Sequence, residues 1–384
     1  MTKTDIVVTT VFEPTWMDGY LSNLRDHGRV DEVVLRIICD RKTPGSVYAA
    51  ADAAARAGFA VDCPSLDEQE AYLRGLGVAE DFIPWNTDNR RNVGFLRAWE
   101  HGADVLVSID DDNYCMPGDD FVGAHHVVGE RAGDLAGCRR ADGGPWFNIC
   151  ELLVPETPGS IYPRGFPYSA RSHEARAELR PVGEEHAAAR VVANAGLWVG
   201  DPDVDAVTRL ALAPRIVGAS PEAVVLGPET WSPVNTQNTA LVRDAMPAYW
   251  YVRMGSGLQG MTVDRFGDIL SGYFLQKCAK HLGDTIRLGS PVTDHRRSPH
   301  DSFRDLHAEL PGMVLLEGVL PWLRDVSLSG DTYAGAYASL AAALREEAPR
   351  FTGFVWDDGG REFLAATADG MDDWLAVLRR IALT

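Results

Sequence analysis

The sequence predicts an α/β fold in which a mixed, mostly parallel sheet is flanked by helices and followed by a helical extension at the C-terminus. Three observations favour this class: β-branched runs alternate with helical segments, one strand is apolar on both faces, and the last part of the chain has helical periodicity. A chain of 384 residues exceeds what one small core usually holds. We therefore expect a large α/β domain over residues 1–300 and a mainly helical extension over residues 301–384.

The first expected elements are two short apolar strands and a helix. Strands are predicted over Asp5–Thr10 and Glu32–Cys39, because β-branched residues dominate both runs and polar turns end them. An alanine-rich helix is predicted over Tyr48–Ala57. Strands that alternate with helices in this way indicate parallel pairing.

The next strand carries the most informative motif. A helix over Asn92–Gly102 is followed by Ala103–Ile109, which is apolar on both faces and ends in Asp110, Asp111 and Asp112. Ligands in open parallel sheets bind beyond the carboxyl ends of the strands. Because neighbouring carboxylates repel one another unless a cation neutralises them, the triplet predicts a magnesium or manganese site. An acidic turn on the surface is the alternative.

The rest of the chain is predicted to contain an irregular segment and three helices. Residues 139–189 are rich in proline, glycine and charge, so we expect an excursion from the sheet that lines the site. A helix is predicted over Asp264–Leu282, with Gly283 as its C-terminal stop. Two further helices are expected over Thr332–Glu347 and Met371–Leu383.

Composition argues against several kinds of partner. Lys and Arg total 36 and Asp and Glu total 55, and the resulting net charge of -19 opposes binding to nucleic acid or anionic lipid. The chain has no run of roughly 18 apolar residues, and Met1–Ile6 lacks the apolar run of a signal peptide. We expect a cytoplasmic protein whose six scattered cysteines are reduced thiols.

Two groups of arginines are candidates for binding an anionic ligand. Arg90, Arg91 and Arg97 accompany the helix before the acidic triplet, where guanidinium groups hold phosphates with bidentate geometry. Arg164 and Arg171 flank an aromatic, proline-containing loop that suits the stacking of a sugar ring. A solvated charged face and ordinary loop packing are the respective alternatives.

Two isolated polar residues and one glycine motif complete the candidates. Asp268 lies near a predicted helix start and His295 in a charged stretch; a helix-dipole partner and a structural histidine are the alternatives. Gly255–Gly260 fits the pattern G-x-G-x-x-G, but no βαβ unit surrounds it. We therefore expect neither a dinucleotide fold nor a flavin.

Several motifs together resemble the reversibly glycosylated polypeptide family, which comprises the plant UDP-arabinopyranose mutases and bacterial relatives. Ser108–Asn113 resembles its strand ending in three aspartates, and Arg164–Arg171 resembles its R-G-[YF]-P-[FY]-S-x-R loop. Asn194–Trp198 with Pro202–Ala206 is similar to its G-L-W and P-D-x-D-A stretch. Met254–Gly260 resembles the family's glycine-rich loop, and Asp268–Gly283 resembles its helix with an acidic start. Gly289–His295 resembles the segment that supplies a histidine.

The resemblance implies a glycosyltransferase-A-like fold and roles for individual residues. It implies that Asp110, Asp112 and His295 bind Mn or Mg, and that Arg164, the arginine associated with reversible glycosylation, acts in catalysis with Asp268. The implied nucleotide contacts are Thr9, Asp40, Asp88, Arg91, Arg97 and Asp111. The implied sugar contacts are Arg171, Gly196, Trp198, Asn238 and Gly255.

The implied activity is a metal-dependent, flavin-independent isomerisation. The substrate would be a nucleotide sugar such as GDP-fucose, GDP-galactose or UDP-arabinose, interconverted between pyranose and furanose forms in antibiotic or glycan biosynthesis. A glycosyltransferase that uses the same donor and a self-glycosylated carrier are the alternatives. The sequence leaves open uracil or guanine as the base, covalent glycosylation of Arg164, and assembly into a homo-oligomer.

Overall fold

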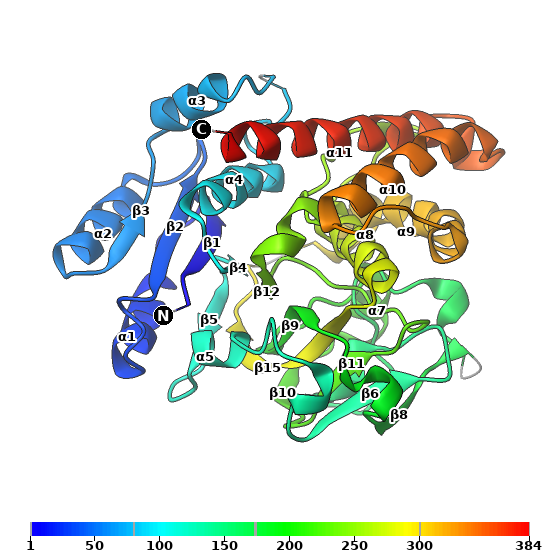
Figure 1. Cartoon of the computed structure of the whole chain (residues 1–384), viewed down its shortest axis with the longest axis horizontal. Helices are drawn as coiled ribbons and strands as arrows, with labels where there is room; N and C mark the ends of the chain where they lie inside the picture. The colour runs from blue at the N-terminus through cyan, green and yellow to red at the C-terminus, as the bar shows by residue number, and fades with distance from the viewer. Residues whose placement is uncertain (1, 80, 173–174, 299–300, 384) are drawn as a thin grey trace.

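A mixed sheet flanked by helices forms the centre of the computed structural model, which describes residues 2–79, 81–172, 175–298 and 301–383 (Figure 1). The strand order along its main path is β3-β2-β1-β4-β12-β9-β15-β11-β6-β8. Strands β1 to β4, β9 and β15 run in one direction, whereas β12 and β11 run in the opposite direction. The α/β class, the mixed sheet and the helical C-terminus expected from the sequence are confirmed.

The strands have the following bounds. Those on the main path are β3 (Ala60–Asp62), β2 (Val33–Cys39), β1 (Thr4–Thr10), β4 (Val105–Asp110), β12 (Asn238–Val242), β9 (Val191–Gly200), β15 (Thr285–His295), β11 (Ala223–Leu226), β6 (Cys138–Asp142) and β8 (Glu178–Pro181). Strand β5 (Asn113–Cys115) pairs with β15, and β7 (Leu153–Pro155) pairs with β10 (Ile216–Ala219). A separate small hairpin joins β13 (Gly257–Leu258) to β14 (Met261–Thr262).

The register of the first strands brings their carboxyl ends to one edge. Thr9 lies opposite Asp110 across the β1–β4 pair, and Thr10 lies opposite Cys39 across the β1–β2 pair. Helix α4 (Arg91–His101) packs closely on β1 through Gly94, where an added Cβ would lie 2.3 Å from a methyl of Val7. Only glycine permits such a close approach of the α4 backbone to β1. This packing places the start of α4 beside the end of β4.

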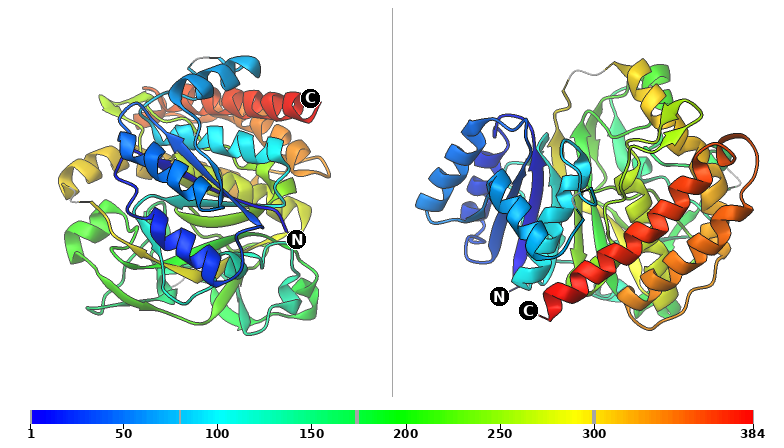
Figure 2. Two further views of the ribbon diagram at one scale, coloured as in Figure 1. Left: turned by 90° about the vertical axis from the view of Figure 1, so that its left-hand side faces the viewer. Right: turned by 90° about the horizontal axis from the view of Figure 1, so that it is seen from above.

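The other helices surround the sheet. The N-terminal and central ones are α1 (Met17–Asp26), α2 (Gly45–Arg56), α3 (Leu66–Gly75), α5 (Phe121–His125), α6 (Glu184–Ala187), α7 (Ala206–Leu212) and α8 (Gly267–Leu282). The C-terminal helices are α9 (Ser302–Asp325), α10 (Tyr333–Glu347) and α11 (Gly360–Ala382). Helix α10 packs against α8, α11 packs against α4 and α9 packs against α7 (Figure 2).

The structure differs from the sequence expectation in the middle segment of the chain. The expected excursion over residues 139–189 contains β7 and β8 and most of β6, and β6 pairs with β8 at the end of the sheet. The expected domain boundary between residues 300 and 301 adjoins residues outside the described part of the chain, so it stays a prediction. All six cysteines are free thiols. In the described part of the chain, no helix combines the length and apolarity that crossing a bilayer requires.

Candidate active site

A cavity of about 420 Å³ opens at the carboxyl ends of β1, β2 and β4. It lies where ligands bind in open α/β sheets. Eleven of the residues singled out from the sequence line it: Thr9, Asp40, Asp88, Arg90, Arg91, Asp110, Asp111, Asp112, Arg164, Asp268 and His295. The fold therefore gathers these predicted residues, which are far apart in the sequence, around one space.

Asp110 and Asp111 carry an electrostatic cost in this cavity. Asp110 accepts a hydrogen bond of 2.5 Å from Arg91 Nη2, and Arg91 Nη1 donates to the carbonyl of Ile109 at 2.8 Å. Enclosure by the protein nevertheless raises the pKa of Asp110 to about 7, against the opposing charge of Arg91. Burial likewise raises the pKa of Asp111 to about 6. A bound cation would relieve this cost.

His295 reaches the triplet through strand pairing. Strand β5 follows the triplet directly and pairs with β15, so that His295 lies opposite Asn113. His295 also lies opposite Gly200, where an added Cβ would be 2.6 Å from the His295 carbonyl oxygen. His295 Nε2 is 3.2 Å from Asp112 Oδ2, while its Nδ1 contacts the carbonyl of Asp201. A backbone carbonyl on the second ring nitrogen is the usual support of a metal-binding histidine.

Asp112 and His295 fit a divalent ion that takes its other ligands from phosphate and water. Magnesium in phosphate-transfer sites commonly has one or two carboxylate ligands beside phosphate oxygens. Within the described residues, no three His, Cys, Asp or Glu side chains are arranged to hold a metal ion by themselves. Asp110, the third predicted ligand, is engaged by Arg91 instead (hydrogen bond of 2.5 Å). Asp110, Asp112 and His295 as metal ligands therefore stay a prediction, in which Asp112 and His295 already lie 3.2 Å apart.

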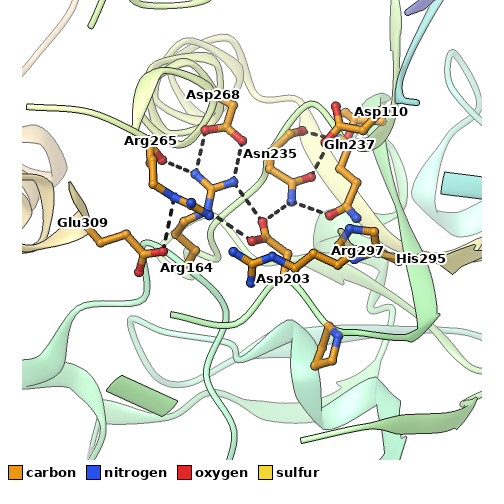
Figure 3. A network of polar contacts seen from close by, with 12 residues as sticks. Asp110, Arg164, Asp203, Asn235, Gln237, Arg265, Asp268, His295, Arg297 and Glu309 are labelled. Atoms are coloured by element: carbon orange, nitrogen blue, oxygen red, sulfur yellow. Dashed lines mark hydrogen bonds and ion pairs between the residues drawn. The ribbon is translucent and has the colours of Figure 1, made fainter. Parts of the chain in front are cut away.

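Arg164 is the centre of a buried ion network (Figure 3). Its guanidinium donates twice to Asp203, at 3.1 and 2.9 Å, and twice to Asp268, at 2.9 Å each. A further hydrogen bond runs from Nη1 to the carbonyl of Arg265. Burial alone would raise the pKa of Asp203, but the charge of Arg164 outweighs this and holds that pKa well below its usual range. Arg164 therefore fixes Asp268 at the start of α8.

The remaining predicted contacts do not line the cavity. Arg97 is six residues beyond Arg91 on α4, which places it on another face of a helix with 3.6 residues per turn. Its guanidinium instead holds Asp62, with two hydrogen bonds of 2.7 Å. The other predicted contacts that lie outside the cavity lining are Arg171, Gly196, Trp198, Asn238 and Gly255.

These five positions lie elsewhere in the fold. Arg171 pairs with Asp205 at 2.8 Å and stacks on Tyr168. Asn238 is buried in β12, where its amide donates to carbonyls of Leu197 and Pro291 and fills the space above Gly196. Trp198 borders a small void of about 10 Å³ beside Arg164, while Gly255 precedes the β13–β14 hairpin.

Sequence reasoning missed several residues of the cavity wall. Asp203 and Arg265 belong to the Arg164 network, and Arg297 follows His295 closely. Phe12, with 55% of its surface exposed, lies on the cavity directly after β1. Phe12 could have been found, because an apolar side chain directly after a strand that ends at the cavity is a local signal. Arg265 and Arg297 had no such local signal.

Helix α9 contributes a buried carboxyl group behind this wall. Glu309 has 1% of its surface exposed; one oxygen accepts from the backbone N–H of Ala206 at 2.8 Å, and the other lies 3.5 Å from Arg265 Nε. Burial raises its pKa from an ordinary value of 4.5 to about 7, although the charges of Arg164 and Arg265 oppose this. Glu309 should therefore affect stability in a defined pH window.

The expected result for Glu309→Gln is a flatter dependence of stability on pH. Between pH 4.5 and about 7 the folded protein keeps a proton on Glu309 that the unfolded chain has lost, so stability falls as the pH rises. The loss amounts to about 3 kcal/mol across that window, and the amide removes it. Urea unfolding of both proteins at pH 5 and pH 8 measures this difference. Equal slopes in the two proteins would contradict the assignment.

The fold and the cavity define an α/β protein with a polar cavity at the carboxyl ends of its strands. The chain belongs to the reversibly glycosylated polypeptide family, whose model matches residues 3–382. It is 25% identical over 244 residues to UDP-arabinopyranose mutase 1 of Oryza sativa subsp. japonica, covering 59% of each chain. It is 26% identical over 296 residues to Probable UDP-arabinopyranose mutase 1 of Pisum sativum, covering 75% of this chain and 74% of the relative.

The extent of these matches differs between relatives. The chain spans about three fifths of the length of the rice protein that it matches. Among solved structures, it is similar to glucosyl-3-phosphoglycerate synthase from Mycobacterium tuberculosis in complex with Mn²⁺, UDP and phosphoglyceric acid. That match has 14% sequence identity and a TM-score of 0.40, and it covers 86% of this chain and 81% of the synthase.

Proposed function

We propose that this protein is a divalent-metal-dependent, flavin-independent mutase that interconverts the pyranose and furanose forms of a nucleotide-linked sugar. Family membership and the similarity to UDP-arabinopyranose mutases support the reaction class. The observation that carries the proposal is that Asp112, His295 and the Arg164–Asp268 pair surround one cavity. This arrangement offers a place for a metal, a diphosphate and a sugar together.

In the proposed reaction, the bond between the anomeric carbon and the diphosphate breaks and its electron pair stays on the diphosphate. Asp112 and His295 would hold a Mn or Mg ion, which when bound supplies charge stabilisation to the leaving diphosphate. A different hydroxyl oxygen of the sugar then bonds to the anomeric carbon and gives up its proton, and the original ring oxygen leaves that carbon and takes up a proton. The same diphosphate re-forms its bond to the anomeric carbon of the rearranged ring. Both fragments must stay in the cavity, because escape of either one gives hydrolysis.

Arg164 and Asp268 are assigned to holding the sugar. The two oxygens of Asp268 are oriented by Arg164, so this carboxylate can accept hydrogen bonds from sugar hydroxyls in a fixed direction. Covalent bonding of sugar to Arg164 would need a neutral nitrogen. Although burial opposes the charge, Asp203 and Asp268 raise the pKa of Arg164 well above its ordinary value. We therefore assign Arg164 an electrostatic role.

An incubation without acceptor tests the proposal. Purified protein is mixed with Mn and a panel of UDP- and GDP-sugars, and the products are separated by chromatography. A furanose isomer that reaches a constant fraction supports the mutase. Free sugar and nucleotide, or no conversion of any sugar in the panel, would overturn it. Intact mass with one sugar adduct per chain and no released product would indicate a self-glycosylated carrier instead.

The nucleobase is expected to stack on Phe12. Base stacking on an aromatic side chain contributes about 1–3 kcal/mol, so Phe12→Ala should weaken the binding of UDP or GDP by roughly tenfold. Calorimetric titration of the nucleotide measures the change. Phe354→Ala is the matched control, because Phe354 has 71% of its surface exposed and does not line the cavity. Unchanged affinity in Phe12→Ala would place the base elsewhere.

A further inference from the structure

Two arginines on the cavity wall share one carboxylate from the C-terminal extension. Asp305 of α9 accepts a hydrogen bond of 2.7 Å from Arg265 Nη1 on one oxygen and one of 2.8 Å from Arg297 Nη2 on the other. Asp305 has 6% of its surface exposed, whereas both arginines line the cavity. The buried carboxylate therefore fixes two guanidinium groups side by side.

The other arginines that line this cavity donate most of their guanidinium N–H groups to protein atoms, which leaves few for a ligand. All five N–H groups of Arg164 are used by Asp203, Asp268 and the carbonyl of Arg265. The Arg91 side chain donates to Asp110, Thr9, Ser108 and two backbone carbonyls. Arg90 donates to Gln69 and Ile83 and lies 3.6 Å over the ring of Trp85.

Arg265 and Arg297 differ from them in this respect. Each keeps guanidinium N–H groups that meet no hydrogen-bond acceptor among the described residues. Arg265 Nε is buried without such a partner, since Glu309 lies 3.5 Å away. In a protein with a net charge of -19, two partly unsatisfied guanidinium groups that share the Asp305 carboxylate favour an anionic ligand.

The backbone of Arg265 supports the same conclusion. Its φ of +59° lies in the left-handed region, which non-glycine residues seldom adopt. Asp264 accepts its N–H at 2.8 Å, and its carbonyl accepts from Arg164. Strained conformations of this kind persist where the surroundings enforce them and cluster at ligand sites. Figure 3 shows the Arg265 side chain between the Arg164 network and Glu309.

We propose that Arg265 and Arg297 bind the diphosphate of the substrate and that Asp305 is the positioning residue that presents them. The inference deepens the proposed function and rests on its nucleotide-sugar substrate. Arg297 follows closely after His295, so the arginine pair stands next to the residues proposed to hold the metal. On this view the C-terminal extension builds part of the phosphate site through α9.

Calorimetric titration with inorganic pyrophosphate in the presence of Mn tests this inference without any sugar chemistry. Wild-type protein should bind pyrophosphate, and Arg265→Gln and Arg297→Gln should each weaken binding by at least about tenfold. Arg253→Gln is the control, because Arg253 pairs with exposed Asp81 and does not line the cavity. Circular dichroism and thermal unfolding establish that each variant is folded.

A double-mutant cycle separates positioning from a general effect on the fold. Asp305→Asn alone should weaken pyrophosphate binding, but it should add little in the Arg265→Gln, Arg297→Gln background. An equal effect of Asp305→Asn in both backgrounds would overturn its positioning role. Pyrophosphate binding that is absent in wild type, or unchanged in both arginine variants, would overturn the inference. Loss of binding in the variants, combined with no furanose product from wild type, would overturn the proposed function alone.

Discussion

Asp112→Asn is expected to abolish metal-dependent turnover. The amide keeps the shape of the side chain but removes the charge that faces His295 Nε2 at 3.2 Å. Loss of groups that merely support metal ligands costs about 10–100-fold, so loss of a proposed ligand should lower kcat/KM by more than about a hundredfold. Initial rates of furanose formation over a range of Mn concentrations measure the effect.

A neighbouring aspartate provides the matched control for this variant. Asp294 precedes His295 but pairs with Arg296 at 2.7 Å, and it does not line the cavity. Asp294→Asn should therefore retain the rate and the manganese dependence of wild type. If Asp112→Asn kept wild-type turnover, or if both variants lost activity equally, Asp112 would have no specific role at the metal.

Arg164→Met is expected to cause the largest loss of stability. Removal of the guanidinium leaves Asp203 and Asp268, whose side chains are 13% and 7% exposed, without their shared cation. Breaking a buried ion pair by removing one partner costs about 3–5 kcal/mol, because an uncompensated charge stays buried. Urea unfolding of wild type and variant measures the change in the free energy of unfolding.

Two comparisons show whether that loss is electrostatic. Adding Asp203→Asn and Asp268→Asn to Arg164→Met should restore part of the stability, since the buried charges are then gone. Arg345→Met removes an exposed arginine that pairs with Asp369 and Asp372 on the surface, and it should cost less than about 1 kcal/mol. A similarly small cost for Arg164→Met would contradict the network described here.

The strands and the acidic edge of the sheet could be predicted because their signals are local. The apolar run Ala103–Ile109 became β4, and the triplet after it reached the cavity. Arg91 reached the cavity and Arg97 did not, although both lie on helix α4. Charge alone does not say which face of a helix meets the ligand, whereas helical periodicity would have separated the two arginines.

The parts of the fold that could not be predicted depend on contacts between residues far apart in the sequence, or on exceptions to the usual sequence signals of helices. Helix α9 continues through Pro311 and Pro321, residues that normally end or kink a helix. Asp305 lies 40 residues from Arg265 in the sequence, and Arg164 lies 104 residues from Asp268. No local pattern indicates that such partners meet, so the phosphate wall and the Arg164 network became visible only in the folded chain.

Anomalous X-ray scattering from crystals grown with manganese and GDP or UDP tests the central claim most directly. The account predicts an anomalous peak that contacts Asp112 and His295 and lies against the diphosphate, and no peak there in Asp112→Asn crystals. A nucleotide bound in the cavity with manganese distant from both side chains, or a peak that persists unchanged in the variant, would contradict it.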